Sequence, residues 1–385
     1  MPPPKPEGAS RVSGALSDLL VVDIATTPAG AWSSRTLASL GANVVMVEGP
    51  EGHPLRRQAP FAPDGSSIAA AYFLGDRRSV SLDLDRERDQ GLLKALLDRA
   101  DVLISSSPPS ELNRRGLQYS QLGLPALVMA HVTHHGMTGP LAEVPGNDLT
   151  ISARSGWASI NGDEDREPLK PSGWQSSYST GVVAAAAVAA AIRHRDHHPN
   201  EGQEIDVAEL EVMAAFFAPA ILRSQYAGEV QARRSDSDLL AGPEPVADGY
   251  FALTLSRAHF WRDAMYLLGL PDLAEDERYE SAQYRRQHRK EYGGRVLEQM
   301  AKWKKMDLFE ELAVRRVVAG PVLTMAELAE VEHLRERGFW TRVAGAAGLE
   351  VAGPPFKASA TPLTVQSLAP RVGEHTDEVL REIRE

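Results

Sequence analysis

Residues 19–48 read LLVVDIATTPAGAWSSRTLASLGANVVMVE, and this stretch decides the fold. Leu19 to Ile24 form a short apolar run, Ala31 to Leu40 carry a helical pattern that ends before Gly41, and Asn43 to Glu48 form a second apolar run. Two such runs separated by a helix are typical of a strand–helix–strand unit, because parallel strands need a crossover connection. We therefore expect a parallel sheet with helices packed on its faces.

The same alternation continues further along the chain. Strands are expected at 79–84, 101–105 and 126–132, and a helix at 90–99. This order predicts a doubly wound α/β sheet. The turn after the first strand, Thr26-Thr27-Pro28-Ala29-Gly30, lacks the GxGxxG fingerprint, so a nicotinamide-dependent dehydrogenase has no support.

The second half of the chain predicts a smaller α+β domain. A long helical pattern runs from Leu210 to Leu239, and the polar stretch 233–242 is typical of a linker. A turn entering a strand follows at 248–253, and helices are expected near 260–268, 292–302 and 306–314. A strand-like piece lies near 349–351, and a last helix begins at Thr376.

Composition restricts the possible partners and location of this 385-residue chain. A net charge of −11 argues against nucleic acid or anionic membranes as partners. The chain has no cysteine, which excludes disulfides and thiolate chemistry and fits a cytoplasmic location. The Pro-rich start has no apolar core, so we expect neither a signal peptide nor an anchor, and we expect residues 1–15 to be a disordered leader. The Ala-rich run Gly181 to Ile192 is too short and too weakly apolar to span a bilayer, and indicates a packed helix.

Histidines follow this Ala-rich run at positions 194, 197 and 198, and two more stand at 134 and 135. Neither an HExxH motif nor a Cys/His spacing accompanies them. Cationic side chains suit the C-terminal end of a helix. We therefore interpret the first group as a solvated helix end and expect no metal site.

Nine motifs in a fixed order connect the chain to a known family. They are TPAG (27–30), LGANVVMVEGP (40–50), RRSVSLDL (77–84), ADVLI (100–104), GMTGP (136–140), GQEIDV (202–207), DGYFA (248–252), AGPVL (319–323) and VGEHTDEVL (372–380). Together they resemble the family III CoA-transferases of the CaiB/BaiF type, typified by carnitine and formyl-CoA transferases. The resemblance covers the chain from about Leu16 to its end.

The resemblance implies a Rossmann-like large domain with an inserted, smaller α+β domain, and two chains interlocked as a dimer. On this basis residues 16–225 and 340–385 form the large, CoA-binding domain, and 226–339 the small domain with its connecting segments. It implies acyl-CoA and a carboxylic acid as substrates, with CoA as a substrate and no permanently bound cofactor. The CoA-binding positions that it implies are Thr26, Thr27, Pro28, Ala29, Leu74, Gly75, Asp76, Arg77, Ser106, Ser107, Pro108, Arg114, Pro145, Asn147 and Asp148. Arg77, Arg78 and Arg114 are the cations that suit CoA phosphates, although each is also compatible with an ordinary surface role.

Ser177 is the main departure from the family pattern. The family keeps a nucleophilic aspartate there, which forms an anhydride and then an aspartyl-CoA thioester, and a serine hydroxyl cannot replace a carboxylate in that chemistry. The sequence also departs in the loop 105–110, which reads SSSPPS, and in 235–245, which replaces the Gly-rich loop that shields the covalent intermediate. Catalysis at Ser177 is therefore expected to be lost or changed.

Other chemistries are weaker alternatives. A racemase would need a histidine at Asn147 and an aspartate at Ser177, and both are missing. A serine nucleophile at Ser177 lacks a GxSxG motif and would need a distant histidine. The carboxylates of 163–167 offer replacements for the aspartate if that loop folds inward. Trp157 and Trp174, which flank it, are either packing residues or walls of an acyl pocket.

Three functions are compatible with these observations. The first, which we favour, is the aspartate-lacking subunit of a heteromeric CoA-transferase, paired with a homologous chain that carries the aspartate. The second is a self-sufficient homodimeric acyl-CoA enzyme with a different nucleophile. The third is a non-enzymatic acyl-CoA binding protein.

Overall fold

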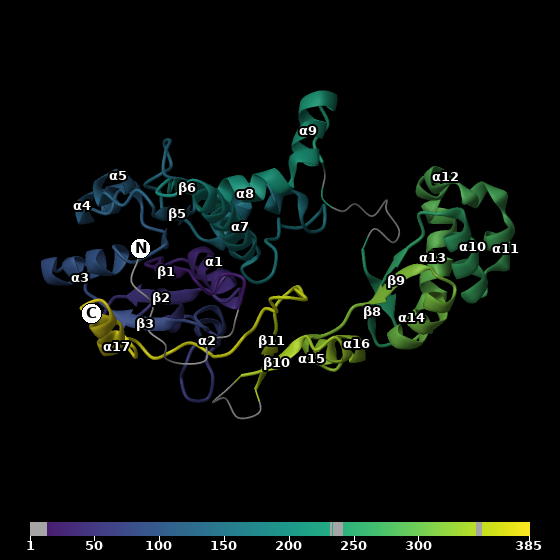
Figure 1. Cartoon of the computed structure of the whole chain (residues 1–385). Helices are drawn as coiled ribbons and strands as arrows, with labels where there is room; N and C mark the ends of the chain where they lie inside the picture. The colour runs from purple at the N-terminus through teal and green to yellow at the C-terminus, as the bar shows by residue number, and fades with distance from the viewer. Residues whose placement is uncertain (1–13, 232, 234–241, 344–348) are drawn as a thin grey trace. The chain divides into compact units, whose positions relative to one another are not determined.

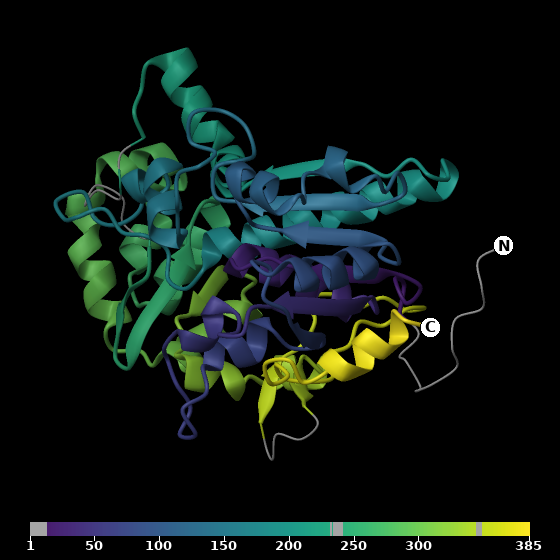
Figure 2. The same cartoon turned by 90° about the vertical axis from the view of Figure 1, so that its left-hand side faces the viewer.

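The core of the molecule is a parallel sheet of six strands in the order β3-β2-β1-β4-β5-β6, seen in the computed structural model of the chain (Figure 1). The structure describes residues 14–231, 233, 242–343 and 349–385. The strands are β1 (Leu20–Asp23), β2 (Asn43–Glu48), β3 (Arg78–Ser81), β4 (Val102–Ser105), β5 (Val128–Thr133) and β6 (Glu204–Ala208). The doubly wound α/β sheet expected from the alternating pattern is thus confirmed, and Figure 2 shows its strands side by side.

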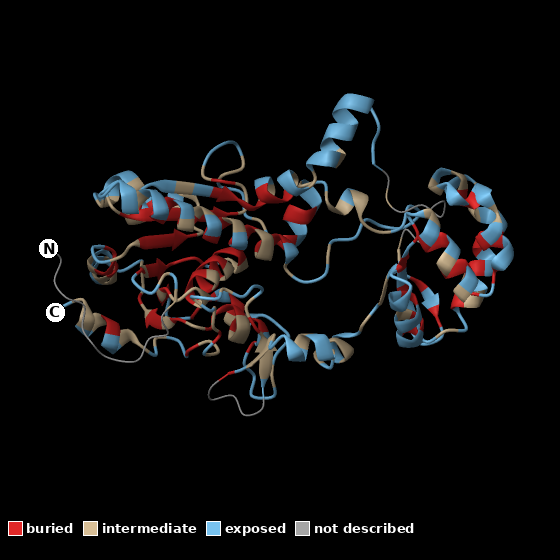
Figure 3. Ribbon diagram, turned by 45° about the vertical axis from the view of Figure 1, so that its right-hand side comes forward, coloured by how far each residue is buried: buried red, intermediate tan, exposed pale blue. Residues whose placement is uncertain are grey.

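Helices cover both faces of this sheet. The helices that connect and follow its strands are α1 (Pro28–Ser39), α2 (Ile68–Phe73), α3 (Glu87–Leu97), α4 (Pro109–Arg115), α5 (Tyr119–Leu122), α6 (Asp148–Arg154), α7 (Gln175–His197), α8 (Glu209–Phe216), α9 (Ala218–Ala227), which has no buried residue, and α17 (Thr376–Glu382). Apolar side chains of α1 and α7 pack on one face, and those of α3, α4 and α17 pack on the other. Because both faces are covered, the inner strands β1, β2, β4 and β5 are largely apolar and buried (Figure 3), whereas the edge strands β3 and β6 are more polar and only partly buried.

Alternate residues of each strand supply the two cores. Val21 and Val44 point to the core under α1 and α7, whereas their neighbours Val22 and Val45 point to the opposite core. The Ala-rich α7 lies close to α1 at Gly181. A Cβ at this position would come within 2.8 Å of both Ala29 O and Trp32 Cβ, so the close contact depends on the glycine. Small residues therefore set the spacing of these two helices beside the site described below.

The described residues group into two compact units. The described residues of the first are 14–159, 169–230, 336–343 and 349–385, and those of the second are 160–168, 231, 233 and 242–335. The loop 160–168, which we expected in the large domain, groups with the second unit. The expected leader and the expected linker at 233–242 lie mostly outside the described residues.

The second unit has its own sheet and core. Its strands β7 (Glu244–Val246), β8 (Gly249–Thr254) and β9 (Val318–Pro321) form a three-stranded antiparallel sheet. Its helices are α10 (Ala258–Leu267), α11 (Pro271–Glu275), α12 (Ala282–Gln287), α13 (Arg289–Met300), α14 (Lys305–Val314) and α15 (Met325–Ala329). Buried Trp261, Val296 and Leu308 from three of these helices pack in one core with Phe251 of β8. Helix α16 (Glu332–Glu336) ends this unit, and the chain then forms the hairpin of β10 (Trp340–Arg342) and β11 (Glu350–Ala352).

The long helix expected from Leu210 to Leu239 is wrong. The structure has α8, which ends at Phe216, and α9, which begins at Ala218 and ends at Ala227. Pro219 stands in the first turn of α9, where a proline suits the start of a new helix but not the interior of a continuous one. Gly228 ends α9 in the left-handed conformation, with φ 65°. No helix in the described part of the chain is long and apolar enough to cross a membrane.

Candidate active site

Asp148 holds the N-terminal end of α7 in place. Its Oδ1 accepts hydrogen bonds from Ser176 Oγ at 2.7 Å and from the Ser176 backbone N–H at 3.2 Å. The first N–H groups of a helix lack partners within the helix, and the helix dipole favours a negative charge there. Asp148 thus connects the start of α6, where it lies, to the start of α7.

Two local interactions fix Asp148 itself. Lys170 Nζ lies 2.7 Å from Asp148 Oδ2 and also donates to the carbonyls of Pro171 and Gly173. Asn147 caps α6 through a reciprocal pair of bonds with Thr150. The side chain at position 147, where a racemase would carry a histidine, therefore serves as a helix cap.

Ser177 meets a buried carboxylate from a different element. Its side chain is buried, and its Oγ donates to Glu209 Oε1 at 3.0 Å. Glu209 is the first residue of α8, directly after β6, and is 1% exposed. Burial raises the pKa of the Glu209 carboxyl, and hydrogen bonds from Ser176 and Ser177 oppose that shift. Glu209 was not predicted from the sequence, because one glutamate after an apolar strand carries no motif.

His134 lies on the other side of the Glu209 carboxylate. It follows β5, and its Nε2 is 3.7 Å from Glu209 Oε2. Burial, and then the neighbouring His135, lower the pKa of His134 to about 4, so this imidazole is neutral at neutral pH and the contact is not an ion pair. The carboxylate contacts the serine directly, which is not the serine–histidine–acid order of a hydrolase triad.

Two of the expected CoA-binding loops meet at the point where the strand order reverses. Thr26 follows β1 and Ser106 follows β4, and these two strands are parallel neighbours. The strands that follow β1 in the chain, β2 and β3, lie on one side of this pair, and those that follow β4, β5 and β6, lie on the other. The Thr26 backbone N–H donates to Ser106 Oγ at 2.8 Å. Thr27 caps α1 by accepting from Gly30 N–H, and Pro108 is the N-cap residue of α4. Ligands of doubly wound folds bind at the carboxyl ends of strands at such a switch point.

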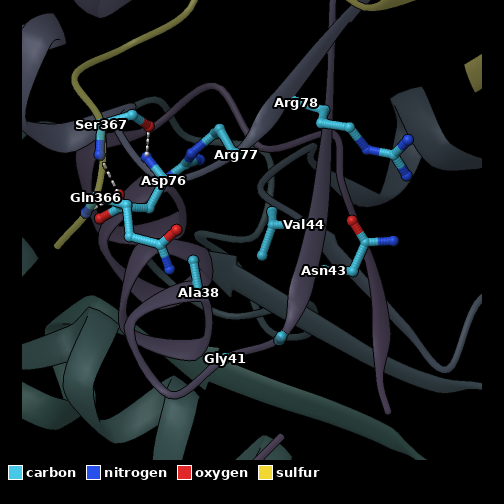
Figure 4. Close-up of a pocket in the computed structure, with 10 residues that line it drawn as sticks. Ala38, Gly41, Asn43, Val44, Asp76, Arg77, Arg78, Gln366 and Ser367 are labelled. Atoms are coloured by element: carbon cyan, nitrogen blue, oxygen red, sulfur yellow. Dashed lines mark hydrogen bonds between the residues drawn. The ribbon is translucent and has the colours of Figure 1, made fainter. Parts of the chain in front are cut away.

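The expected site residues Leu74 to Arg77 precede β3 and therefore lie at the amino end of the sheet. Asp76 Oδ1 accepts from the backbone N–H groups of Gln366 and Ser367 at 2.7 and 2.8 Å (Figure 4). A cavity of about 410 Å³ lies beside them, lined by residues that include Asn43, Asp76, Arg78 and Gln366 (Figure 4). Asp76 thus holds the C-terminal segment where it returns to the sheet.

Arg77 does not have the phosphate-facing position expected of it. Its side chain is fully buried, with Nη1 2.9 Å from Asp23 Oδ2 and also donating to Ser34 Oγ, and its other N–H groups donate to carbonyls of Ala31, Phe73 and Gly75. Burial lowers the pKa of Arg77 to about 10, so it remains a cation at neutral pH. All its donors are used inside the fold, which corrects the expectation that this side chain contacts CoA.

Of the other two arginines, Arg78 is largely buried, with a side chain 14% exposed, and Arg114 is on the surface. Arg78 pairs with Glu378 and Glu382 of α17, and in Figure 4 its side chain extends away from Asp76. Arg114 on α4 is 66% exposed and pairs only loosely with Asp85 and Glu111, at 3.7 and 3.9 Å. Of the three, Arg114 is the cation that the fold leaves free to move toward a phosphate.

The two tryptophans that flank the loop 160–168 pack in different places. Trp174 lies against Phe73, with 5.3 Å between ring centroids, in an aromatic group that also contains Trp32, Tyr72 and Tyr178. Trp157 lies beside Phe217, with 5.0 Å between ring centroids and the rings tilted at 54°. Trp174 thus packs directly before the start of α7, next to Ser176 and Ser177.

The remaining candidates of the sequence analysis lie on the surface. The acidic residues of 163–167 are exposed, and Arg233 donates to the backbone carbonyls of Asp163, Glu164 and Arg166. His194 and His198, with Glu201, bring ligand atoms within 4.8 Å of one another, which is close enough to share an ion. All three are exposed, and the sequence analysis did not include Glu201 in the histidine group.

Comparison with known proteins identifies the family. The sequence model of CoA-transferase family III matches residues 16–376. The chain is 31% identical over 382 residues to a succinate–glutarate CoA-transferase from Agrobacterium fabrum, covering 96% of this chain and 95% of the relative. It is 30% identical to the subunit BbsE of a succinyl-CoA:(R)-benzylsuccinate CoA-transferase from Thauera aromatica, covering 94% and 92%.

A solved structure agrees over the whole chain. A CaiB/BaiF family protein from Brucella suis superposes with a TM-score of 0.88 at 29% identity, covering 96% of this chain and 99% of that one. The nine motifs, the doubly wound sheet and these matches lead to one assignment. The chain belongs to CoA-transferase family III.

Proposed function

We propose that this chain transfers CoA from succinyl-CoA to a carboxylic acid, at the polar cluster formed by Asp148, Ser176, Ser177 and Glu209. The observation that carries the proposal is this buried, hydrogen-bonded cluster at the start of α7. The sequence resemblance places the nucleophile of the family at the same position, which supports the proposal. Both relatives named above carry succinate or succinyl-CoA in their names, which supports succinyl-CoA as the donor.

CoA binding is proposed at the carboxyl end of the sheet. Its residues are Thr26, Thr27, Pro28, Ala29, Ser106, Ser107, Pro108, Arg114, Pro145, Asn147 and Asp148. The switch point between β1 and β4 supports the first two loops, since backbone N–H groups and helix N-termini there suit a phosphorylated ligand. The free Arg114 supports a phosphate contact on α4.

Two assemblies are compatible with CoA transfer by a complex that contains this chain, both as an interlocked dimer in the cytoplasm. In the first, this chain is the aspartate-lacking subunit and a homologous chain supplies the aspartate. One relative is named as a subunit, which supports that form. In the second, the chain forms a homodimer that needs no other subunit. The buried carboxylate of Glu209 beside Ser177 favours the second form.

Activity and mass measurements on purified protein test the proposal. The chain is incubated with succinyl-CoA and a panel of dicarboxylic acids, and new CoA thioesters are measured by mass spectrometry. Transfer to at least one acid supports the function. Calorimetry with succinyl-CoA separates the alternatives, since binding without transfer indicates a non-catalytic subunit or a binding protein, whereas an absence of binding contradicts the proposal.

The native mass of the complex from its natural cell then distinguishes a heteromer from a homodimer. A second, homologous chain in that complex supports the subunit form. A dimer of this chain alone supports the self-sufficient form.

A further inference from the structure

We propose that Glu209 is the nucleophile of this chain, replacing the carboxylate that is missing at position 177. The inference rests on the proposed CoA transfer and adds the residue that accepts CoA. It starts from one contact, the hydrogen bond of 3.0 Å between Ser177 Oγ and Glu209 Oε1. That bond places a carboxylate beside position 177, supplied by α8 instead of α7.

On this proposal, the catalytic carboxylate comes from residue 209 of α8 and not from residue 177 of α7. A carboxylate on residue 177 would share a small buried volume with that of Glu209. Two carboxylates held so closely cannot both ionise in a buried site. Serine at 177 removes this conflict and donates a hydrogen bond to the carboxylate that remains.

Other carboxylates of the described part of the chain are less suitable. Asp148 is held by Ser176 and Lys170 and supports the start of α7. The acidic residues of 163–167 are exposed, and they group with the second unit. Glu209, in contrast, follows β6, and His134 follows the neighbouring strand β5, so both lie at the carboxyl end of the sheet where CoA is proposed to bind.

Burial suits Glu209 to a covalent intermediate. An anhydride or an acyl thioester on the enzyme must be kept from water, and the sequence lacks the Gly-rich loop that shields it in the family. Glu209 is 1% exposed, so neither water nor a thioester reaches its carboxylate unless neighbouring side chains move. The His134 side chain, 20% exposed, lies 3.7 Å from Oε2 and is a partly exposed neighbour whose movement would open the carboxylate to the acyl-CoA.

The reaction balances without any further reagent. A carboxylate oxygen of Glu209 attacks the thioester carbonyl carbon, a C–O bond forms, the C–S bond breaks and CoA leaves as a thiolate. The thiolate attacks the glutamyl carbonyl of this anhydride, which gives a glutamyl-CoA thioester and releases the first acid as a carboxylate. The acceptor carboxylate then attacks the glutamyl thioester carbonyl, so that a C–O bond forms, the C–S bond breaks, CoA leaves as a thiolate and a second anhydride results. The thiolate attacks the acceptor carbonyl of this anhydride, and the C–O bond to the glutamyl oxygen breaks, which releases the new acyl-CoA and restores the Glu209 carboxylate.

The test locates the covalent adduct. Purified full-length chain is incubated with succinyl-CoA, treated with hydroxylamine or borohydride, digested and analysed by mass spectrometry. Modification of Glu209 is expected. In Glu209→Gln, adduct and transfer should fall on the order of 1,000-fold or more, as for loss of a nucleophile. The exposed Glu211→Gln, on the same helix, is the matched control and should keep full activity.

Two further variants test whether the adduct is lost in Glu209→Gln because the nucleophile is missing or because the protein misfolds. Ser177→Ala should still form the adduct on Glu209. The double variant Ser177→Asp with Glu209→Gln should move the adduct to residue 177. Calorimetry with succinyl-CoA shows whether each variant keeps its binding site.

Several results would overturn the inference. They are an adduct on another residue, full transfer by Glu209→Gln, or succinyl-CoA binding by the wild type without any adduct. An absence of succinyl-CoA binding by the wild type would instead contradict the proposed function itself.

Discussion

Arg77 is a structural residue at the centre of the large unit. Its guanidinium pairs with Asp23 and donates to three carbonyls, and the side chain is fully buried. We expect Arg77→Ala to lower the free energy of unfolding by about 3–5 kcal/mol, because it leaves the Asp23 carboxylate buried and unpaired. Urea unfolding measures this change, and stability equal to the wild type would contradict it.

Arg114→Ala is the matched surface change. Its ion pairs are exposed and long, so we expect unfolding to change by no more than about 0.5 kcal/mol. If Arg114 contacts a CoA phosphate, the same change weakens CoA binding by about 1–3 kcal/mol, as for a charge-assisted hydrogen bond. Calorimetry that finds unchanged affinity would remove Arg114 from the CoA site.

His53 makes the stability of the large unit depend on pH. Burial, then the charges of Arg77 and Arg56, lower its pKa to about 3, whereas an unfolded chain has a histidine pKa of about 6.5. Between these values the unfolded state binds the extra proton, so stability is present above pH 6.5 and is lost as the pH falls.

We expect His53 to contribute a loss of about 2 kcal/mol between pH 7 and pH 5. Urea unfolding at several pH values should therefore show a flatter pH dependence in His53→Gln. Glu48, Arg56 and Arg57 also lie near this side chain, so the comparison uses the difference between variants. The exposed His333→Gln is the control, and an equal flattening there would contradict the assignment to His53.

At the scale of single elements, the contact of α1 with α7 depends on Gly181. A methyl group there would come within 2.8 Å of Ala29 O and Trp32 Cβ. We expect Gly181→Ala to destabilise the protein by about 1–3 kcal/mol, because the helices must separate. Gly91→Ala is the control, since it lies on the exposed side of α3 with open space around it, and should stabilise by about 0.5–1 kcal/mol. Thermal unfolding of both variants tests the contrast.

The sequence predicted the elements of the large unit well, because their signals are local. Strands with near-continuous apolar runs, such as 43–48, and helices with a regular period were placed within a few residues. The helix across Phe217 was predicted wrongly, since its apolar pattern continues through a break made by Pro219. A run of helix-favouring residues does not show that one helix ends at Phe216 and the next begins at Ala218.

The candidate site was only partly predictable, because its contacts join distant segments. Ser177 and Asp148 were found through family motifs, but their partners depend on the folded chain. Glu209 is 32 positions from Ser177 and carries no motif of its own. Arg77 was expected at the surface because sequence alone does not show that Asp23, 54 positions earlier, is its buried partner.

At the scale of the whole molecule, the last segment of the chain completes the first unit. Asp76 binds the backbone of Gln366 and Ser367, and Arg78 pairs with two glutamates of α17. We expect a chain that ends at residue 361 to expose β3, so the amides of 78–81 should exchange hydrogen much faster. The amides of β8, in the other unit, serve as the internal control. Unchanged exchange in β3 would show that the end of the chain is dispensable.

The contact between β3 and the C-terminal segment has a consequence for biosynthesis. Strand β3 is at the edge of the sheet, and its residue Ser79 exchanges hydrogen bonds with His375. During translation this edge has no partner until the ribosome has passed His375, 296 positions after Ser79, whereas 231–335 is made earlier. A nascent chain with an open sheet edge can pair with a neighbour on the same polysome. Stalling or premature termination between residues 335 and 375 should therefore yield aggregates instead of a shortened, folded protein.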